Sequence, residues 1–244
     1  MQSGVEGQRP TLVSFSGIDG AGKSTQIEAL RARLAETGLP VRVIPFWDEV
    51  ARLKNLRETS GHKIFKGDKG VGSPDRPIER RDKNVRSRTM SLVRLFLYSV
   101  DALSLRFVVR RALRSERGFL ICDRYAWDEL VNLNLRNPFM RLFVRFIVKF
   151  VPRPDVSYIL DADPIQARAR KPEYPLEFLY SCRESYLTLS EIVGGMTIIP
   201  PNPVPEVHRQ IMQALLRASE GREGDRGTNL QQSMEGPGAS PASL

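Results

Sequence analysis

A short glycine-rich stretch near the start of the chain constrains its fold more than any other feature. Residues 17–24 read Gly-Ile-Asp-Gly-Ala-Gly-Lys-Ser and fit the pattern Gly-x-x-x-x-Gly-Lys-Ser. A β-rich run at 11–16 precedes the stretch, and Lys23 to Glu36 follow with apolar residues at helical spacing. A further apolar run at 41–45 completes the order strand, loop, helix, strand. This order predicts a βαβ unit with parallel strands and a right-handed crossover.

Later apolar runs continue the same pattern, and long segments with helical spacing separate them. The predicted strands lie at 119–122, 156–160 and 196–199, and the predicted helices at about 89–115, 137–151, 175–192 and 204–218. The sequence therefore predicts an α/β fold, a doubly wound parallel five-stranded sheet with helices on both faces.

The length of 244 residues suits one large α/β domain, which we place at 11–218. We expect residues 1–10 to be flexible and the polar, Gly/Ser/Pro-rich residues 219–244 to be disordered. The segment 56–88 is basic and poor in apolar anchors, which predicts a mobile surface segment. The chain has two cysteines without metal spacing, no leader-like apolar region at its start and no apolar run long enough to cross a bilayer. These features favour a cytoplasmic protein.

The glycine-rich stretch has the residue types that a phosphate-binding loop needs. Glycines allow close approach of the backbone to phosphate, and the N–H groups at the following helix start attract the anion. Lys23 adds a full positive charge, and the Ser24 hydroxyl is placed to bind Mg²⁺. The candidate residues for the phosphates of ATP are Gly17, Gly20, Ala21, Gly22, Lys23, Ser24 and Thr25. The alternative is a plain glycine-rich turn, which has no need of Lys-Ser.

An acidic residue follows one of the predicted central strands. The apolar run 119–122 places Asp123 at the carboxyl edge of the sheet, where such folds bind ligands. Enzymes with a phosphate loop use an acid there to hold Mg²⁺, so Ser24 and Asp123 are the predicted metal ligands. Arg124 comes next and could bridge donor and acceptor phosphates. The alternative is a helix-capping aspartate followed by a surface arginine.

These residues resemble thymidylate kinases, a family of nucleoside monophosphate kinases with a P-loop. The resemblance is carried by the loop at 17–26 and by Asp123-Arg124-Tyr125. It extends to Leu160-Asp-Ala-Asp-Pro164 with the basic residues that follow, to 178–189 and to 206–216.

The resemblance implies roles for single residues. Lys23 would bind the donor phosphates, Asp19 would face the acceptor, and Arg124 would contact the phosphates. A mobile lid at about 164–177 would close over ATP and exclude water. The lid residues would be Arg168, Arg170 and Lys171, and the implied catalytic residues are Lys23, Arg124, Arg168 and Arg170. From the residues alone, Asp163-Pro164 starts a helix, and a solvated basic helix face is the alternative.

The predicted acceptor half departs from the family pattern. Trp47 and Asp48 stand where the family carries Arg-Glu-Pro, and Asp101 lacks the arginine that usually follows it. Asn132-Leu133 stands where the family has a glutamine. The sequence therefore predicts a changed acceptor pocket. The candidate lining residues are Asp19, Trp47, Asp48, Asp101 and Tyr125.

We expect an ATP-dependent phosphotransferase that moves the γ-phosphoryl group to a nucleoside monophosphate such as dTMP, or to a related small acceptor. The alternative is a nucleotide-binding switch or regulatory protein with a degenerate acceptor site, associated with membranes in one version. The chain has no Asn-Lys-x-Asp guanine-reading motif. Its net charge of +9 and the basic segment 52–88 leave nucleic-acid binding as a third alternative, which the lack of aromatic interleaving disfavours.

One predicted helical stretch carries a competing signal. Residues 138–151 place Arg141, Arg145 and Lys149 on one stripe among aliphatic and aromatic residues. A core helix or a homodimer face would explain this pattern. Peripheral membrane binding is the less favoured alternative, driven by apolar area and attraction to acidic lipids.

Overall fold

A computed structural model of the chain describes residues 9–46 and 88–220. The predicted mobile segment 56–88 lies outside these residues except for its last position, as do nearly all of the predicted flexible ends 1–10 and 219–244. Within the described ranges, no helix is long and apolar enough to cross a membrane.

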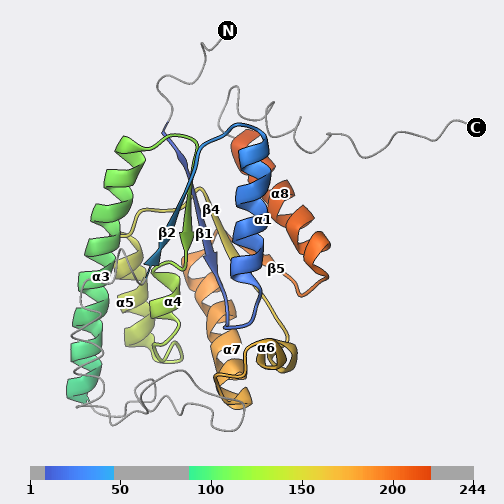
Figure 1. The fold of residues 1–244 in the computed structure, drawn as a ribbon. Coiled ribbons are helices and arrows are strands. Elements are labelled where there is room, and N and C mark those ends of the chain that lie inside the picture. The colour runs from blue at the N-terminus through green and yellow to red at the C-terminus, as the bar shows by residue number, and fades with distance from the viewer. Residues whose placement is uncertain (1–8, 47–87, 221–244) are drawn as a thin grey trace, which may run out of the picture.

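The predicted parallel sheet is confirmed, with strands in the order β2-β3-β1-β4-β5 (Figure 1). The strands are β1 (Thr11–Ser16), β2 (Val41–Pro45), β3 (Phe119–Asp123), β4 (Val156–Leu160) and β5 (Met196–Ile199). Every residue of β1 and β4 is buried. This burial explains their nearly continuous apolar sequences, because helices cover both faces of such a sheet.

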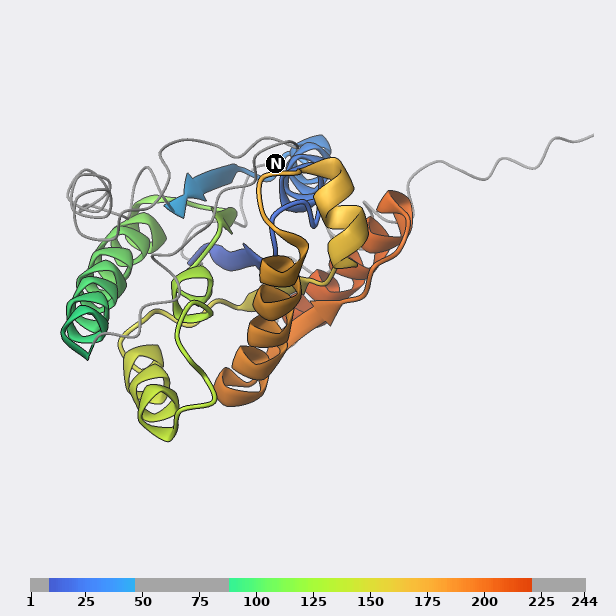
Figure 2. The same cartoon turned by 90° about the horizontal axis from the view of Figure 1, so that it is seen from below.

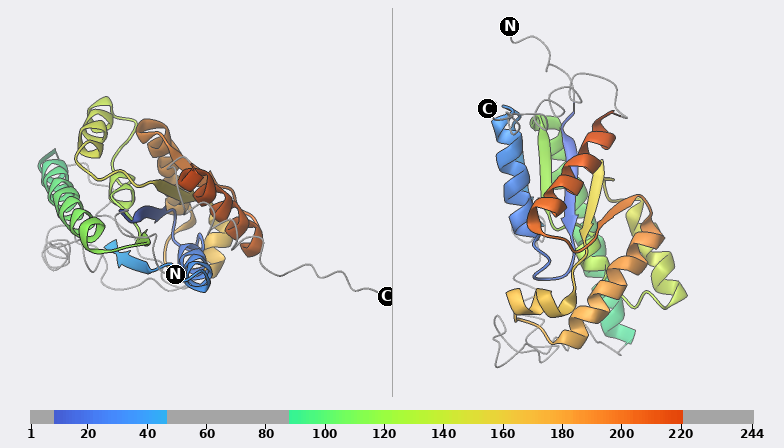
Figure 3. Two further views of the ribbon diagram at one scale, coloured as in Figure 1. Left: turned by 90° about the horizontal axis from the view of Figure 1, so that it is seen from above. Right: turned by 90° about the vertical axis from the view of Figure 1, so that its right-hand side faces the viewer.

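Helices lie on both sides of the sheet, as predicted (Figures 1 and 3). One layer contains α1 (Lys23–Glu36) and α8 (Val204–Glu220), and the other contains α3 (Arg88–Ser115), α5 (Pro138–Val148) and α7 (Leu176–Val193). The alternation of side chains along β1 separates the two cores. Leu12 packs in the cluster that includes Val109 of α3, whereas Val13 packs in the cluster that includes Leu30 of α1.

Two short helices, α4 (Trp127–Leu130) and α6 (Pro164–Arg170), follow the carboxyl ends of β3 and β4. The helix start predicted at Asp163-Pro164 is confirmed, since the Asp163 carboxylate accepts a hydrogen bond from the Ile165 N–H. The helix α4 was not predicted, because a single turn has too little apolar periodicity to detect. Like the 17–22 loop, these short helices lie toward the end of the molecule that faces the viewer in Figure 2.

Candidate active site

The glycine-rich loop is held by close backbone contacts on two sides. Gly17 and Gly20 have φ angles of 141° and 82°. A Cβ atom on Gly17 would lie 2.5 Å from the Leu160 carbonyl oxygen at the end of β4, and one on Gly20 would lie 2.2 Å from the Ala167 carbonyl oxygen of α6. Both distances are shorter than any tolerable contact. The loop therefore has its shape because these positions lack a side chain, and it packs directly on α6.

Lys23 is buried at the start of α1, and its Nζ lies across the loop. The ammonium group donates hydrogen bonds of 2.8 Å to the Gly17 carbonyl oxygen and 2.9 Å to the Ile18 carbonyl oxygen. Burial, followed by the positive charge of Arg124, lowers the pKa of Lys23 to about 8, although nearby carboxylates oppose this shift. Lys23 is thus mostly charged at neutral pH and is surrounded by little water.

The two predicted metal ligands lie at the start of α1 and at the end of β3. Ser24 lies exposed in the first turn of α1, and Asp123 is the last residue of β3, in register with Phe15 of β1. Among the described residues, no group of three or more His, Cys, Asp or Glu side chains could form a metal cage. A hydroxyl and a carboxylate beside a phosphate loop fit Mg²⁺, which keeps several waters and takes few protein ligands.

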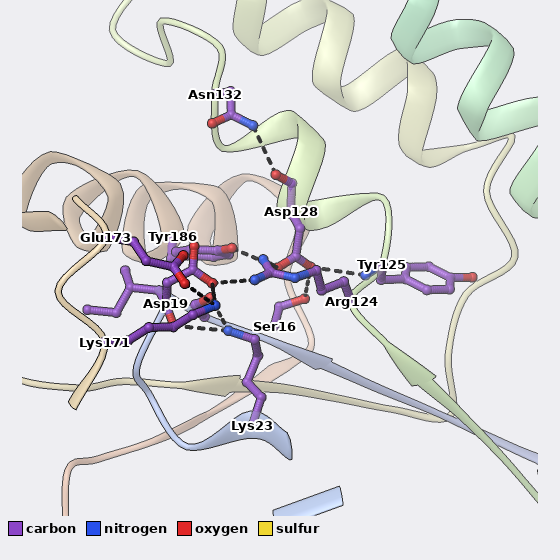
Figure 4. A network of polar contacts seen from close by, with 12 residues as sticks. Ser16, Asp19, Lys23, Arg124, Tyr125, Asp128, Asn132, Lys171, Glu173 and Tyr186 are labelled. Atoms are coloured by element: carbon purple, nitrogen blue, oxygen red, sulfur yellow. Dashed lines mark hydrogen bonds and ion pairs between the residues drawn. The ribbon is translucent and has the colours of Figure 1, made fainter. Parts of the chain in front are cut away.

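Arg124 has an unusual backbone conformation. Its φ angle is 70°, in the left-handed region that non-glycine residues rarely adopt. Its N–H donates a 3.0 Å hydrogen bond to the Phe15 carbonyl oxygen, and its guanidinium forms an ion pair with Asp19 of the loop. An unfavourable backbone conformation of this kind persists only where surrounding contacts hold it, and it is common at functional sites. The sharp turn aims the guanidinium from the end of β3 at the loop (Figure 4).

Asp19 is the acidic residue of the loop, and three basic side chains, Arg124, Lys23 and Lys171, lie near its carboxylate. Besides Arg124, the Nζ of Lys171 lies 4.0 Å from the Asp19 carboxylate and 3.3 Å from that of Glu173 (Figure 4). Burial would raise the pKa of Asp19, but the positive charges of Arg124, Lys23 and Lys171 lower it. The Asp19 carboxylate therefore stays ionised in the physiological pH range.

Asp128 is a buried carboxylate that the sequence analysis missed. One oxygen accepts hydrogen bonds from the Ser16 hydroxyl at 2.6 Å and the Tyr125 N–H at 3.0 Å. The other accepts from the Tyr186 hydroxyl at 2.8 Å and from Arg124 Nη1 at 3.4 Å. Burial, followed by the negative charge of Asp128, raises the pKa of Tyr186 well above its ordinary value, so its hydroxyl remains a donor. The available signal was the spacing of the opposite charges Arg124 and Asp128 by four residues.

Two of the predicted lid residues, Arg170 and Lys171, lie beside the loop. Arg168 is half-buried and Arg170 is exposed, both on α6. The Nη1 of Arg170 is 3.9 Å from the position that a Cβ atom on Gly22 would occupy. The structure thus brings Arg170 and Lys171 to the same loop as Lys23 and Arg124.

The predicted acceptor residues do not all converge. Trp47 and Asp48 lie outside the described residues. Tyr125 is fully buried, and its hydroxyl donates to the Pro152 carbonyl oxygen, so its ring points away from the Asp19 cluster (Figure 4). The large ring is packed in the core against Trp127, with ring centroids 5.3 Å apart. Asp101 is 2% exposed and lines, together with Phe46 and Glu129, a cavity of about 10 Å³.

Comparisons with known proteins agree with these features. No family model matches the chain. A probable thymidylate kinase of Methanosphaera stadtmanae is 26% identical over 201 residues, which cover 80% of this chain and 91% of the relative. A thymidylate kinase of Prochlorococcus marinus is also 26% identical, over 220 residues that cover 84% of this chain and 95% of the relative.

A solved structure supports the fold assignment. The thymidylate kinase of Candida albicans matches with a TM-score of 0.57 and 17% identity, covering 89% of this chain and 96% of that protein. The predicted P-loop kinase fold is confirmed, and the predicted resemblance to the thymidylate kinase-like family is confirmed with it.

Proposed function

We propose that this thymidylate kinase-like protein is an ATP-dependent nucleoside monophosphate kinase with dTMP as its first candidate acceptor. The observation that carries the proposal is the ion pair between Arg124 at the end of β3 and Asp19 within the loop, with Lys23 buried beside it. The relatives support the same reaction, because the chain spans more than 90% of proteins named thymidylate kinase or probable thymidylate kinase.

Lys23 and the loop would hold the donor side. The loop N–H groups would face the phosphates of ATP, and the Lys23 ammonium would move from the Gly17 and Ile18 carbonyl oxygens to a phosphate oxygen. Ser24 and Asp123 would hold Mg²⁺, which offsets phosphate charge when bound. With little water around Lys23, its charge acts at a low effective dielectric constant.

Arg124 would stabilise the group in transfer. It lies between Asp19 and Asp128, so its guanidinium is oriented before any substrate binds. Preorganised charge of this kind lowers the barrier because the protein need not reorganise during the reaction. Asp19, kept ionised, would accept hydrogen bonds from the acceptor, and Arg124 would then share its positive charge with the phosphates.

The segment 164–177 would act as the lid. Arg168, Arg170 and Lys171 would approach the phosphates from α6 and the turn after it. The close approach of Ala167 to Gly20 supports this role, because it places α6 directly beside the loop that would hold the phosphates. Exclusion of water by the lid would direct the phosphoryl group to the acceptor and away from hydrolysis.

A nucleotide-dependent switch is not favoured, because the relatives are named as kinases over nearly their full lengths. We further infer a cytoplasmic enzyme, for which the free thiols Cys122 and Cys182 offer support. The predicted homodimer stays a proposal, to be tested by light scattering of the purified chain.

The test is ADP release by the purified chain with ATP and Mg²⁺ in the presence of nucleoside monophosphates, nucleosides or sugars. We expect a nucleoside monophosphate, dTMP first, to raise the rate well above that of ATP alone. A chain that binds ATP but releases ADP at the same rate with every acceptor would contradict the proposal.

Lys23→Ala should lower kcat by about 10²- to 10³-fold, as removal of one preorganised donor usually does. The matched control is Lys149→Ala, which removes an exposed lysine from the end of α5. Equal activity of the two variants would remove Lys23 from the mechanism.

A further inference from the structure

The outward side of α5 carries large apolar side chains that the fold does not use. Phe139, Leu142 and Phe146 are 58%, 63% and 55% exposed, and Phe150, just after the helix, is 38% exposed. Their spacing of three or four residues places them along one line of the helix surface, and the rings of Phe146 and Phe150 lie 4.8 Å apart. We call these four residues the apolar stripe.

The inward side of the same helix packs in the hydrophobic core through residues outside the apolar stripe. Val144 and Ile147 are buried in the cluster that includes Val109 of α3 and Leu189 of α7. The start of the helix is capped by Asn137, whose side chain accepts a hydrogen bond from the Phe139 N–H. The helix is therefore anchored without the apolar stripe. Exposure of the stripe to water is unfavourable in free energy, and within the described residues the stripe makes no core contacts that would compensate for it.

A line of basic residues runs beside the apolar stripe. Arg141, Arg145 and Lys149 are exposed and follow each other at intervals of four, one turn apart. Between positions 131 and 154 the chain has no Asp or Glu, and the helix is flanked by Arg153 and by Arg136, which pairs with Glu184 of α7. From α3, Arg106 adds a further guanidinium, which donates a 3.0 Å hydrogen bond to the Phe150 carbonyl oxygen. This side of the molecule is thus both apolar and strongly positive.

We propose that the apolar stripe and its basic neighbours bind the surface of an anionic lipid bilayer. A helix with exposed Phe and Leu beside Arg and Lys can lie in the interfacial plane, with rings among the acyl chains and cations at the headgroups. Charge complementarity favours this occupant over a second copy. A two-fold interface through this face would bring the same basic lines together, with no acid between 131 and 154 to offset them.

The location of α5 is compatible with catalysis at a membrane surface. Figure 2 looks onto the end of the molecule that carries the loop, and α5 lies at the periphery, on the other side of α7 from α6. Docking through α5 would therefore leave the nucleotide site open to solvent.

The test is co-sedimentation of the full-length chain with vesicles. We expect binding to phosphatidylcholine vesicles that contain phosphatidylserine, weak binding to phosphatidylcholine alone, and loss of binding at high salt. No binding to anionic vesicles at low salt would overturn the proposal.

Substitutions can show whether vesicle binding depends on this face or only on the overall positive charge of the chain. The double variant Leu142→Ser/Phe146→Ser should bind anionic vesicles at least about tenfold more weakly, since it removes the inserted area. Removal of charge by Arg141→Gln or Arg145→Gln should weaken binding about fivefold for each arginine at low salt. The matched controls on α8 are Val204→Ser, at an apolar residue that is 51% exposed, and Arg217→Gln, at an exposed arginine. Both should bind like the unmodified chain.

Light scattering and kinase assays complete the design. If the chain is a dimer, and Leu142→Ser/Phe146→Ser makes it a monomer while its vesicle binding stays unchanged, the face is an interface between copies and the proposal fails. Kinase activity without vesicles should be equal in all five variants. A variant that fails to fold would lose this activity, so misfolding can be told apart from a loss of lipid binding.

Discussion

At the proposed donor end of the site, backbone contacts determine the geometry, whereas the described candidates for the acceptor end are packed in the core. Gly20 meets the α6 backbone so closely that no side chain fits, and Arg124 holds a left-handed turn. By contrast, Tyr125 and Asp101 are almost fully buried. A phosphate group is the same in every nucleotide, so a rigid backbone cradle suits it. Residues that bind an acceptor through their side chains could be substituted without disturbing such a cradle.

The strongest test of the donor end is the pH dependence of stability. Lys23 has a pKa of about 8 in the folded chain, against 10.5 ordinarily. Between these two pH values the unfolded state binds more protons, so stability should rise with pH across this window. The gap corresponds to about 3 kcal/mol as an upper limit.

Urea unfolding of the unmodified chain and of Lys23→Met from pH 7 to pH 11 would measure this effect. The difference between the two should shrink as pH rises, because the folded chain no longer holds a buried charge. A pH-independent difference would mean that the ammonium group is well solvated by its carbonyl partners.

Asp128→Asn tests the link between the two ends. The amide keeps the volume but loses the negative charge that faces Arg124 and Tyr186, at a cost of about 2 kcal/mol in stability. The value of kcat should fall because the Arg124 guanidinium loses one of its two carboxylate partners. Glu184→Gln, which removes an exposed partner of Arg136, should change neither quantity.

Two glycines with similar φ angles separate close packing from backbone freedom. A Cβ atom on Gly20 (φ 82°) would meet the Ala167 carbonyl oxygen, whereas one on Gly38 (φ 71°) would have nothing within 4 Å. Both alanine variants incur the left-handed penalty of about 1 kcal/mol. Gly20→Ala should lose about 1 kcal/mol more, and also activity, since α6 must move. Equal stability and activity of the two variants would show that α6 shifts freely.

The smallest expected effect is at the acceptor end. Tyr125→Phe removes the hydrogen bond to the Pro152 carbonyl oxygen and should cost about 1 kcal/mol in stability. The KM for the acceptor should not change, because the ring lies in the core. A raised KM with unchanged stability would return Tyr125 to the pocket and weaken the contrast between the two ends.

The same contrast explains what could be predicted from the sequence. Strands β1 and β4 were predicted at their observed bounds, since short apolar runs between loop residues admit one interpretation in an α/β chain. The loop was predictable because its function depends on residue type and spacing along the chain. Asp128 was missed because its importance depends on Ser16 and Tyr186, which are distant in sequence. Tyr125 was assigned to a pocket because a motif does not show which way a side chain turns.

The contact of Gly20 with Ala167 has a consequence for how such a protein can diverge. The atoms of α6 that a Cβ atom at position 20 would meet belong to the backbone of Ala167. No substitution of an α6 side chain can therefore make room for a larger residue at position 20. A descendant with a side chain there would need a shorter or displaced α6, which is a change in chain length or path. Among diverged relatives, a side chain at position 20 should therefore occur together with insertions or deletions in the segment after β4.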